Sequence, residues 1–343
     1  MKIFKNRSES PLMSGFIPTR QPWPLLAACV CACSPVAQAD PYSTEILSDS
    51  PLAYFRFDDG VATDDRDAAD NLGSLGAAAR AYWGSTTTRS VTGALTADAN
   101  TAVRTAGTAA SAMSVPYQAG LNVQGSFSVE AWLKIPASSA LSPCILSSLH
   151  AADPRAGWTL IQGSSAQGFR FRTYNKNGVN SAVTINSGAI TPNTWYHVVA
   201  VWDDAAKVAK IYQNGALKAT SSAVVPVAPA TRAFEANTDA SFTIGMMPDS
   251  TVPWSGDLDE VAYYPAALTL AQVQAHYTNG TNASRPQPYQ EAVLADIPRR
   301  LLAARRRRFR APHAGTRGRQ RRVAWHRRQW RLLRWFQKYR QRS

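Results

Sequence analysis

Cysteine is scarce in this 343-residue chain, and three of its four cysteines lie within residues 29–33. Basic residues precede the apolar run that holds them, and residues 37–39 (Ala-Gln-Ala) form a small-residue cleavage site, which is typical of a secretory signal peptide over residues 1–39. Cleavage there leaves Cys144 alone and excludes an intramolecular disulfide. A second interpretation stays open, because residues 26–29 match a lipoprotein cleavage box that would anchor the protein through Cys29. Either way, we expect a protein that is secreted, extracellular or held at the cell surface.

Long apolar runs are also absent, and no stretch of residues suggests a transmembrane span. Residues 299–343 contain no acid and carry 17 arginines plus Lys338, whereas residues 40–298 hold 15 basic and 22 acidic residues, a net charge of −7. The formal charge of +14 therefore belongs to the tail, and it does not predict specific binding of nucleic acid. We expect the basic tail to bind polyanions or membranes non-specifically.

Short segments of strand-like sequence, separated by glycine, asparagine, aspartate and proline, run from about residue 50 to residue 264. Apolar residues alternate cleanly over 126–135, as expected of a strand with one buried face. One helix is predicted to begin at Leu270, because Thr269 and Gln272 form a capping box, and Gly280 can end it. The pattern predicts an all-β, two-sheet antiparallel sandwich with one short C-terminal helix, followed by a disordered or helical basic tail.

Three segments carry a family resemblance: residues 191–203, residues 210–215 and residues 256–264. Together they resemble the laminin-G-like, or concanavalin A-like lectin/glucanase, family. The resemblance implies a jelly-roll sandwich over residues 40–283 and a non-catalytic recognition module for carbohydrate or protein ligands. Its partner would be an extracellular glycan or a cell-surface protein. Two alternatives remain: a glycan-cleaving hydrolase of the same fold, and a structural spacer domain in a repeat array.

Paired carboxylates with the spacing of a glycanase are missing. Retaining glycosidases hold two carboxyl groups about 5 Å apart. In the concanavalin A-like fold, a strand that reads Glu-x-Asp-x-x-Glu usually places them, and residues 256–261 do not supply that spacing. On a strand, Asp257 and Asp259 share a face while Glu260 points the other way. Glu130 has no acid near it in the sequence, and the histidines lack the spacing of zinc ligands. We therefore expect no catalytic residues.

The same acids suit calcium, which prefers oxygen ligands. The resemblance implies a structural calcium site at the position of Asp259, with Asp257 and Asp70 as further candidate ligands. The acids between residues 58 and 67 could contribute to it. Solvated loop acids, with Asp259 capping a turn, explain the pattern equally well.

Sugar-binding platforms need exposed aromatic side chains on loops or on an open face. Arginines beside them could contact hydroxyl or carboxylate groups of a ligand. For each candidate taken singly, packing in the core is favoured over ligand contact, and we expect Trp132, Trp195 and Trp202 to be core residues. The candidate ligand-binding residues are Trp83, Trp158, Arg170, Arg172, Tyr174 and Trp254.

An internal repeat relates residues 41–51 to residues 288–298 at a constant offset of 247 residues. Proline, tyrosine, leucine, aspartate and proline match, and the similarity stops at Arg299. The repeat predicts that residues 284–298 are a linker and the start of a second copy of the domain. We interpret residues 299–343 as a disordered segment or as a frameshifted remnant of that copy, a hypothesis that the coding DNA tests.

Overall fold

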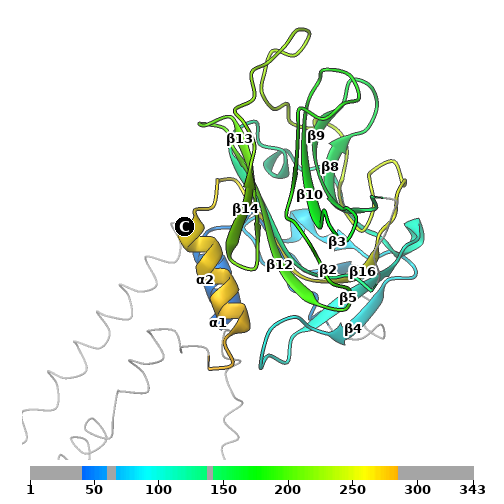
Figure 1. Cartoon of the computed structure of the whole chain (residues 1–343). Coiled ribbons are helices and arrows are strands. Elements are labelled where there is room, and N and C mark those ends of the chain that lie inside the picture. The colour runs from blue at the N-terminus through cyan, green and yellow to red at the C-terminus, as the bar shows by residue number, and fades with distance from the viewer. Residues whose placement is uncertain (1–40, 60–66, 137–141, 285–343) are drawn as a thin grey trace, which may run out of the picture. The chain divides into compact units, whose positions relative to one another are not determined.

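The computed structural model describes residues 41–59, 67–136 and 142–284. The predicted signal peptide, the second copy of the repeat and the basic tail lie outside the described residues. The described residues form two antiparallel sheets that pack face to face, as predicted (Figure 1). In order, the first sheet contains β14 (Ala216–Thr220), β13 (Val208–Gln213), β12 (Trp195–Asp203), β7 (Phe127–Lys134), β16 (Ser255–Tyr264), β5 (Thr101–Ala106) and β4 (Thr88–Thr92), and β1 (Ala53–Phe55) pairs with β16.

The second sheet lies on the other side of the main core. Short 3-10 helices, η1 (Gly76–Ala79), η2 (Ala109–Ser111) and η3 (Ala119–Leu121), interrupt the loops between strands. In order, this sheet contains β11 (Val183–Asn186), β10 (Phe169–Asn175), β9 (Ala156–Gln162), β8 (Cys144–His150), β15 (Phe242–Ile244), β6 (Met113–Val115), β3 (Ala81–Tyr82) and β2 (Ala68–Ala69).

Strand β7 lies in the middle of the first sheet, and both of its faces are buried. The predicted alternation is confirmed, because Phe127, Val129 and Leu133 point into the core between the sheets. On the opposite face, Glu130 and Trp132 lie under the helices. Burial on both faces explains why the strand contacts two separate apolar clusters. Trp132 and Trp202 are core residues, as predicted, whereas Trp195 is partly buried.

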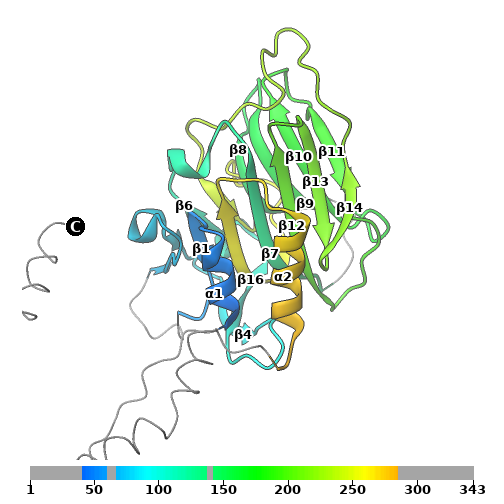
Figure 2. The same cartoon turned by 90° about the vertical axis from the view of Figure 1, so that its left-hand side faces the viewer.

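Two helices, α1 (Pro41–Ser48) and α2 (Leu270–Thr281), lie side by side over the outer face of the first sheet (Figure 2). The predicted capping box of Thr269 and Gln272 is present at the start of α2. The prediction that Gly280 ends this helix was wrong, because the helix continues to Thr281. Gly280 instead permits close packing, since a Cβ atom there would lie 2.5 Å from the Trp132 ring. Neither described helix has the length and apolar character of a membrane span.

Candidate functional site

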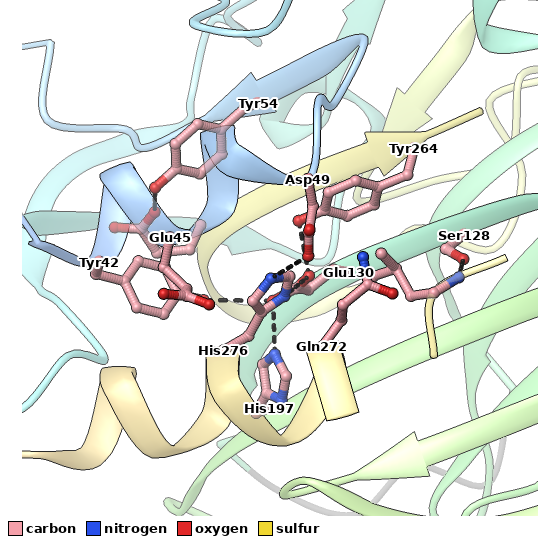
Figure 3. A network of polar contacts seen from close by, with 12 residues as sticks. Tyr42, Glu45, Asp49, Tyr54, Ser128, Glu130, His197, Tyr264, Gln272 and His276 are labelled. Carbon is pink, nitrogen blue, oxygen red and sulfur yellow. Dashed lines mark hydrogen bonds and ion pairs between the residues drawn. The ribbon is translucent and has the colours of Figure 1, made fainter. Parts of the chain in front are cut away.

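A buried polar network joins both helices to β7 and β12 (Figure 3). Glu130 Oε1 lies 2.6 Å from His197 Nε2, and Glu130 Oε2 lies 2.9 Å from His276 Nδ1. The other ring nitrogen of His276 lies 3.0 Å from a carboxylate oxygen of Asp49, which follows α1. Tyr264 donates a hydrogen bond to Glu130 Oε2 over 2.9 Å. The network therefore ties the sheet to the two helices.

Opposite charges hold the two ends of this network in their ionised forms. Burial alone would raise the pKa of Glu130, but the neighbouring His276 and His197 hold it well below its usual range. Burial alone would lower the pKa of His276, but Glu130 and Asp49 raise it to about 9. Glu130, His197 and His276 are all fully buried, so a ligand cannot reach them in this conformation. Their arrangement stabilises the fold instead of forming an open site.

Nothing local in the sequence signals this network, because its residues are far apart along the chain. Glu130 has no acid near it in the sequence, and the spacing of His197 and His276 gives no sign that they meet. The repeat offered one indirect clue. Tyr42, Ile46 and Asp49 have counterparts in the second copy of the repeat. All three pack or hydrogen-bond against the first sheet or α2. The second copy of those positions lies outside the described residues.

The three predicted calcium ligands have separate partners. Asp257 forms ion pairs with Arg104 at 2.6 Å and with Lys134 at 2.9 Å, and Asp70 forms one with Arg80 at 2.9 Å. Among the described residues, no group of three or more His, Cys, Asp or Glu side chains is placed to hold a metal ion. The structure therefore does not unite these carboxylates in one site. Most of the acid-rich loop between residues 58 and 67 lies outside the described residues, so calcium binding there stays a prediction.

Asp259 is buried, and its surroundings correct one prediction. It accepts hydrogen bonds from Ala94 N at 2.8 Å and from Asn100 Nδ2 at 3.0 Å, and burial raises its pKa to about 8. The same amide donates to Glu260 Oε1 at 2.7 Å. Asp259 and Glu260 therefore do not point to opposite faces, because β16 has an irregular register after Asp259 and Glu260 has a φ of 52°.

Three of the predicted sugar platforms are core residues. Trp158, Tyr174 and Trp254 are 2%, 1% and 0% exposed, so they cannot stack on a ligand in this conformation. Burial of these large rings stabilises the core more than exposure would. Trp254 Nε1 donates its hydrogen bond inside the protein, to Gln162 Oε1. Trp83 is partly buried, with Arg89 over its ring.

Open hollows lie instead around the loop that follows β14. Three of them, of about 420, 420 and 380 Å³, share Val224 as a lining residue, and we call them together the Val224 groove. Val225 and Val227 line it and are 76% and 65% exposed. Opposite them, the turn after β10 contributes polar side chains. The polar residues that line the groove are Gln124, Asn175, Asn177, Asn180, Ser181, Thr184, Asp204, Lys207, Ser221, Ser222, Thr231 and Arg232.

Backbone hydrogen bonds fix both walls of the Val224 groove to the sandwich. On one wall, the Val224 N–H donates to Lys207 O over 2.8 Å, and the Glu235 N–H donates to Tyr174 O over 3.0 Å. On the other wall, the Lys176 N–H donates to Arg155 O over 2.9 Å. An ion pair of 3.7 Å between Lys176 and Glu235 joins the turn to the loop. The groove is thus pre-formed, which lowers the entropy cost of binding.

The fold and this rim of loops define a lectin-like β-sandwich, a carbohydrate-binding fold. Residues 105–274, just under half of the chain, match the model of the concanavalin A-like lectin/glucanases superfamily. The resemblance noted in the sequence is thereby confirmed. A comparison with curated protein sequences gives no match.

Several solved structures are similar to this chain. The binding domain of Paraclostridial Mosquitocidal Protein 1 has 13% identity and a TM-score of 0.50; the match covers 68% of this chain and 52% of that one, so this chain spans about half its length. Domain 4 of AbnA, an extracellular arabinanase from Geobacillus stearothermophilus, was solved with arabinotriose and has 18% identity, a TM-score of 0.47 and coverage of 66% and 98%. The botulinum neurotoxin serotype D ligand binding domain, solved with N-acetylneuraminic acid, has 14% identity, a TM-score of 0.48 and coverage of 69% and 52%.

Proposed function

We propose that this protein is a secreted, non-catalytic recognition module that binds an extracellular glycan in the Val224 groove. The observation that carries the proposal is that exposed valines face amide and hydroxyl side chains in two pre-formed hollows of the groove, which share Val224 and Val225. A pyranose ring presents an apolar C–H face and a rim of hydroxyl groups. Asparagine side chains both donate and accept hydrogen bonds, as those hydroxyl groups require. The match of residues 105–274 to a lectin and glucanase superfamily supports the same ligand class.

The distribution of carboxylates supports binding without cleavage. Among the described residues that line the groove, Asp204 is the one acid, and Lys207 neutralises it at 2.9 Å. A retaining glycosidase needs two carboxyl groups about 5 Å apart that face the substrate. Elsewhere in the described structure, Glu130 and Asp257 are engaged by internal cations. These carboxylates are therefore poorly placed for general acid and base chemistry.

The groove is open and shallow, so we expect weak binding at a single site. Affinity at a surface would then come from several copies acting together, because linked sites raise the effective concentration of one another. The sequence repeat at residues 288–298 is consistent with such an arrangement.

A glycan array tests the proposal directly, followed by titration of the best-bound oligosaccharide into wild type and two variants. Asn180→Ala removes an exposed groove amide, and we expect it to weaken binding about tenfold, as for loss of one or two hydrogen bonds. Gln274→Ala removes an exposed amide from α2 and is the matched control.

Three outcomes would overturn the proposal. The first is an array with no bound glycan, which would favour a protein ligand or a spacer. The second is equal weakening in the two variants. The third is release of reducing sugar from the bound glycan by wild type, which would indicate a hydrolase.

A further inference from the structure

Two arginines lie next to the Val224 groove on the outer face of the second sheet. Arg170 and Arg172 alternate along β10 with Phe169 and Phe171, which point into the core. In the antiparallel register, Arg172 is opposite Thr159 of β9 on one side and Thr184 of β11 on the other. Because cross-strand partners share a face of the sheet, these side chains lie together. Thr184 also lines the groove, so this one residue adjoins both the groove and Arg172.

The pair lacks an acidic partner. Within the described part of the chain, no carboxylate lies within ion-pair distance of Arg170 or Arg172, although residues 40–298 carry more acids than bases. Arg170 Nε donates a hydrogen bond to Asn186 Oδ1 over 3.0 Å, a neutral acceptor. Burial and the neighbouring Arg172 guanidinium lower the pKa of Arg170. The two cations therefore repel each other without compensation.

Two buried polar atoms at the same place also lack partners. Thr159 is fully buried, and its Oγ1 atom has no hydrogen-bond partner among the described residues. The Nε atom of Arg172, its cross-strand neighbour, is likewise buried and unpartnered. Leaving a buried donor unsatisfied costs about 1–3 kcal/mol. A guanidinium donor without an acceptor, next to a second cation, indicates a place for an anion beside the partly exposed arginines.

We propose that the outer face of β9, β10 and β11 is a subsite for the carboxylate of an acidic sugar, such as a uronic acid or a sialic acid. Arg172 and Arg170, which are both partly exposed, hold the carboxylate. The planar guanidinium group favours a carboxylate because its N–H groups match both oxygens. The proposal rests on the glycan-binding function and specifies its ligand class: the neutral part of the glycan lies in the Val224 groove.

Isothermal titration of the full chain in 0.15 M salt tests the subsite with two matched pairs of probes. Trigalacturonic acid is compared with its methyl ester, and sialyllactose with lactose, so the two arms separate the two sources of the carboxylate. We expect at least one acid to bind about tenfold more tightly than its neutral counterpart. Arg172→Gln should remove that preference and leave the affinity for the neutral probe within twofold of wild type.

Two further variants separate the subsite from general charge and from folding. Lys218→Gln removes the same charge from the exposed strand β14 and should change nothing. Thr159→Val keeps the buried shape and should leave binding of the acid within twofold of wild type, with a melting temperature at least as high as wild type, because its hydroxyl is buried and has no partner.

Specific results overturn the subsite. One is equal affinity for acid and neutral probe in both arms. Another is acid binding that survives Arg172→Gln, which would assign it to the basic tail. If wild type binds acid and neutral probes equally, and Asn180→Ala weakens binding of the neutral probe, the subsite is refuted and the groove is kept. No binding of any of the four probes refutes the subsite, and the glycan array then decides the groove separately.

Discussion

Replacing His276 with glutamine should remove a pH-dependent part of the stability of this domain. The ring of His276 is fully buried between Glu130, 2.9 Å away, and Asp49, 3.0 Å away. Its pKa is about 9 in the folded protein, against 6.5 for the free side chain. Glutamine is neutral and of similar size, so the His276→Gln variant loses the charge without leaving a large cavity.

The sign and size of the effect follow from that difference in pKa. Because the folded state holds the proton more tightly, the contribution of His276 is complete below about pH 6.5 and is lost as the pH rises through 9. At about 1.4 kcal/mol for each unit of pKa, the contribution is about 3 kcal/mol. That agrees with the cost of about 3–5 kcal/mol for removing one partner of a buried ion pair.

Urea unfolding at pH 6 and at pH 10 measures this contribution. The variant should be about 3 kcal/mol less stable than wild type at pH 6, and within about 1 kcal/mol of it at pH 10. Comparison of the two proteins cancels other titrations, including that of Asp259. His150→Gln is the matched control, because His150 forms a partly exposed pair with Asp239 that is worth at most about 1 kcal/mol. A stability difference between wild type and His276→Gln that does not change with pH would refute the reasoning.

Three other predictions concern the helix layer and calcium. Gly280→Ala should destabilise the domain by about 1–3 kcal/mol in urea unfolding, because its methyl group would press on Trp132, whereas Gly125→Ala, which has open space around it, should be near neutral. Thr269→Ala removes the capping box of α2 and should cost about 1 kcal/mol in the same assay, and an unchanged midpoint would contradict this. Calcium added to chelator-treated protein should raise the melting temperature, and Asp257→Asn should leave that rise intact, because internal cations already neutralise Asp257. Absence of any rise in wild type would end the calcium hypothesis.

The fold could be predicted from the sequence to a large extent. Alternation along residues 127–135 placed the core face of β7, and the pairing of Thr269 with Gln272 placed the start of α2. These features depend on neighbours within a few residues, where the periods of strand and helix apply. The end of α2 was misplaced, because a tertiary contact of Gly280 with Trp132 outweighed the usual preference of glycine for helix ends.

The candidate site could be predicted only in part. The sequence singled out Arg170 and Arg172, which the structure places on an outer face, but it also singled out Trp158 and Trp254, which are buried. Aromatic residues of core and surface look alike in a sequence, since both alternate with polar neighbours. The loop after β14, which forms the Val224 groove, carries no motif at all.

The sequence by itself determined the class of fold, the family resemblance and the start of α2, because strand alternation and capping are local properties of the chain. Only the tertiary structure decided which charges meet. Glu130 and His276 are 146 residues apart and form one ion pair, and an irregularity in β16 brings Glu260 to the same amide as Asp259. Contacts of this kind depend on sheet register and on the packing of whole elements, and no short stretch of sequence specifies either one.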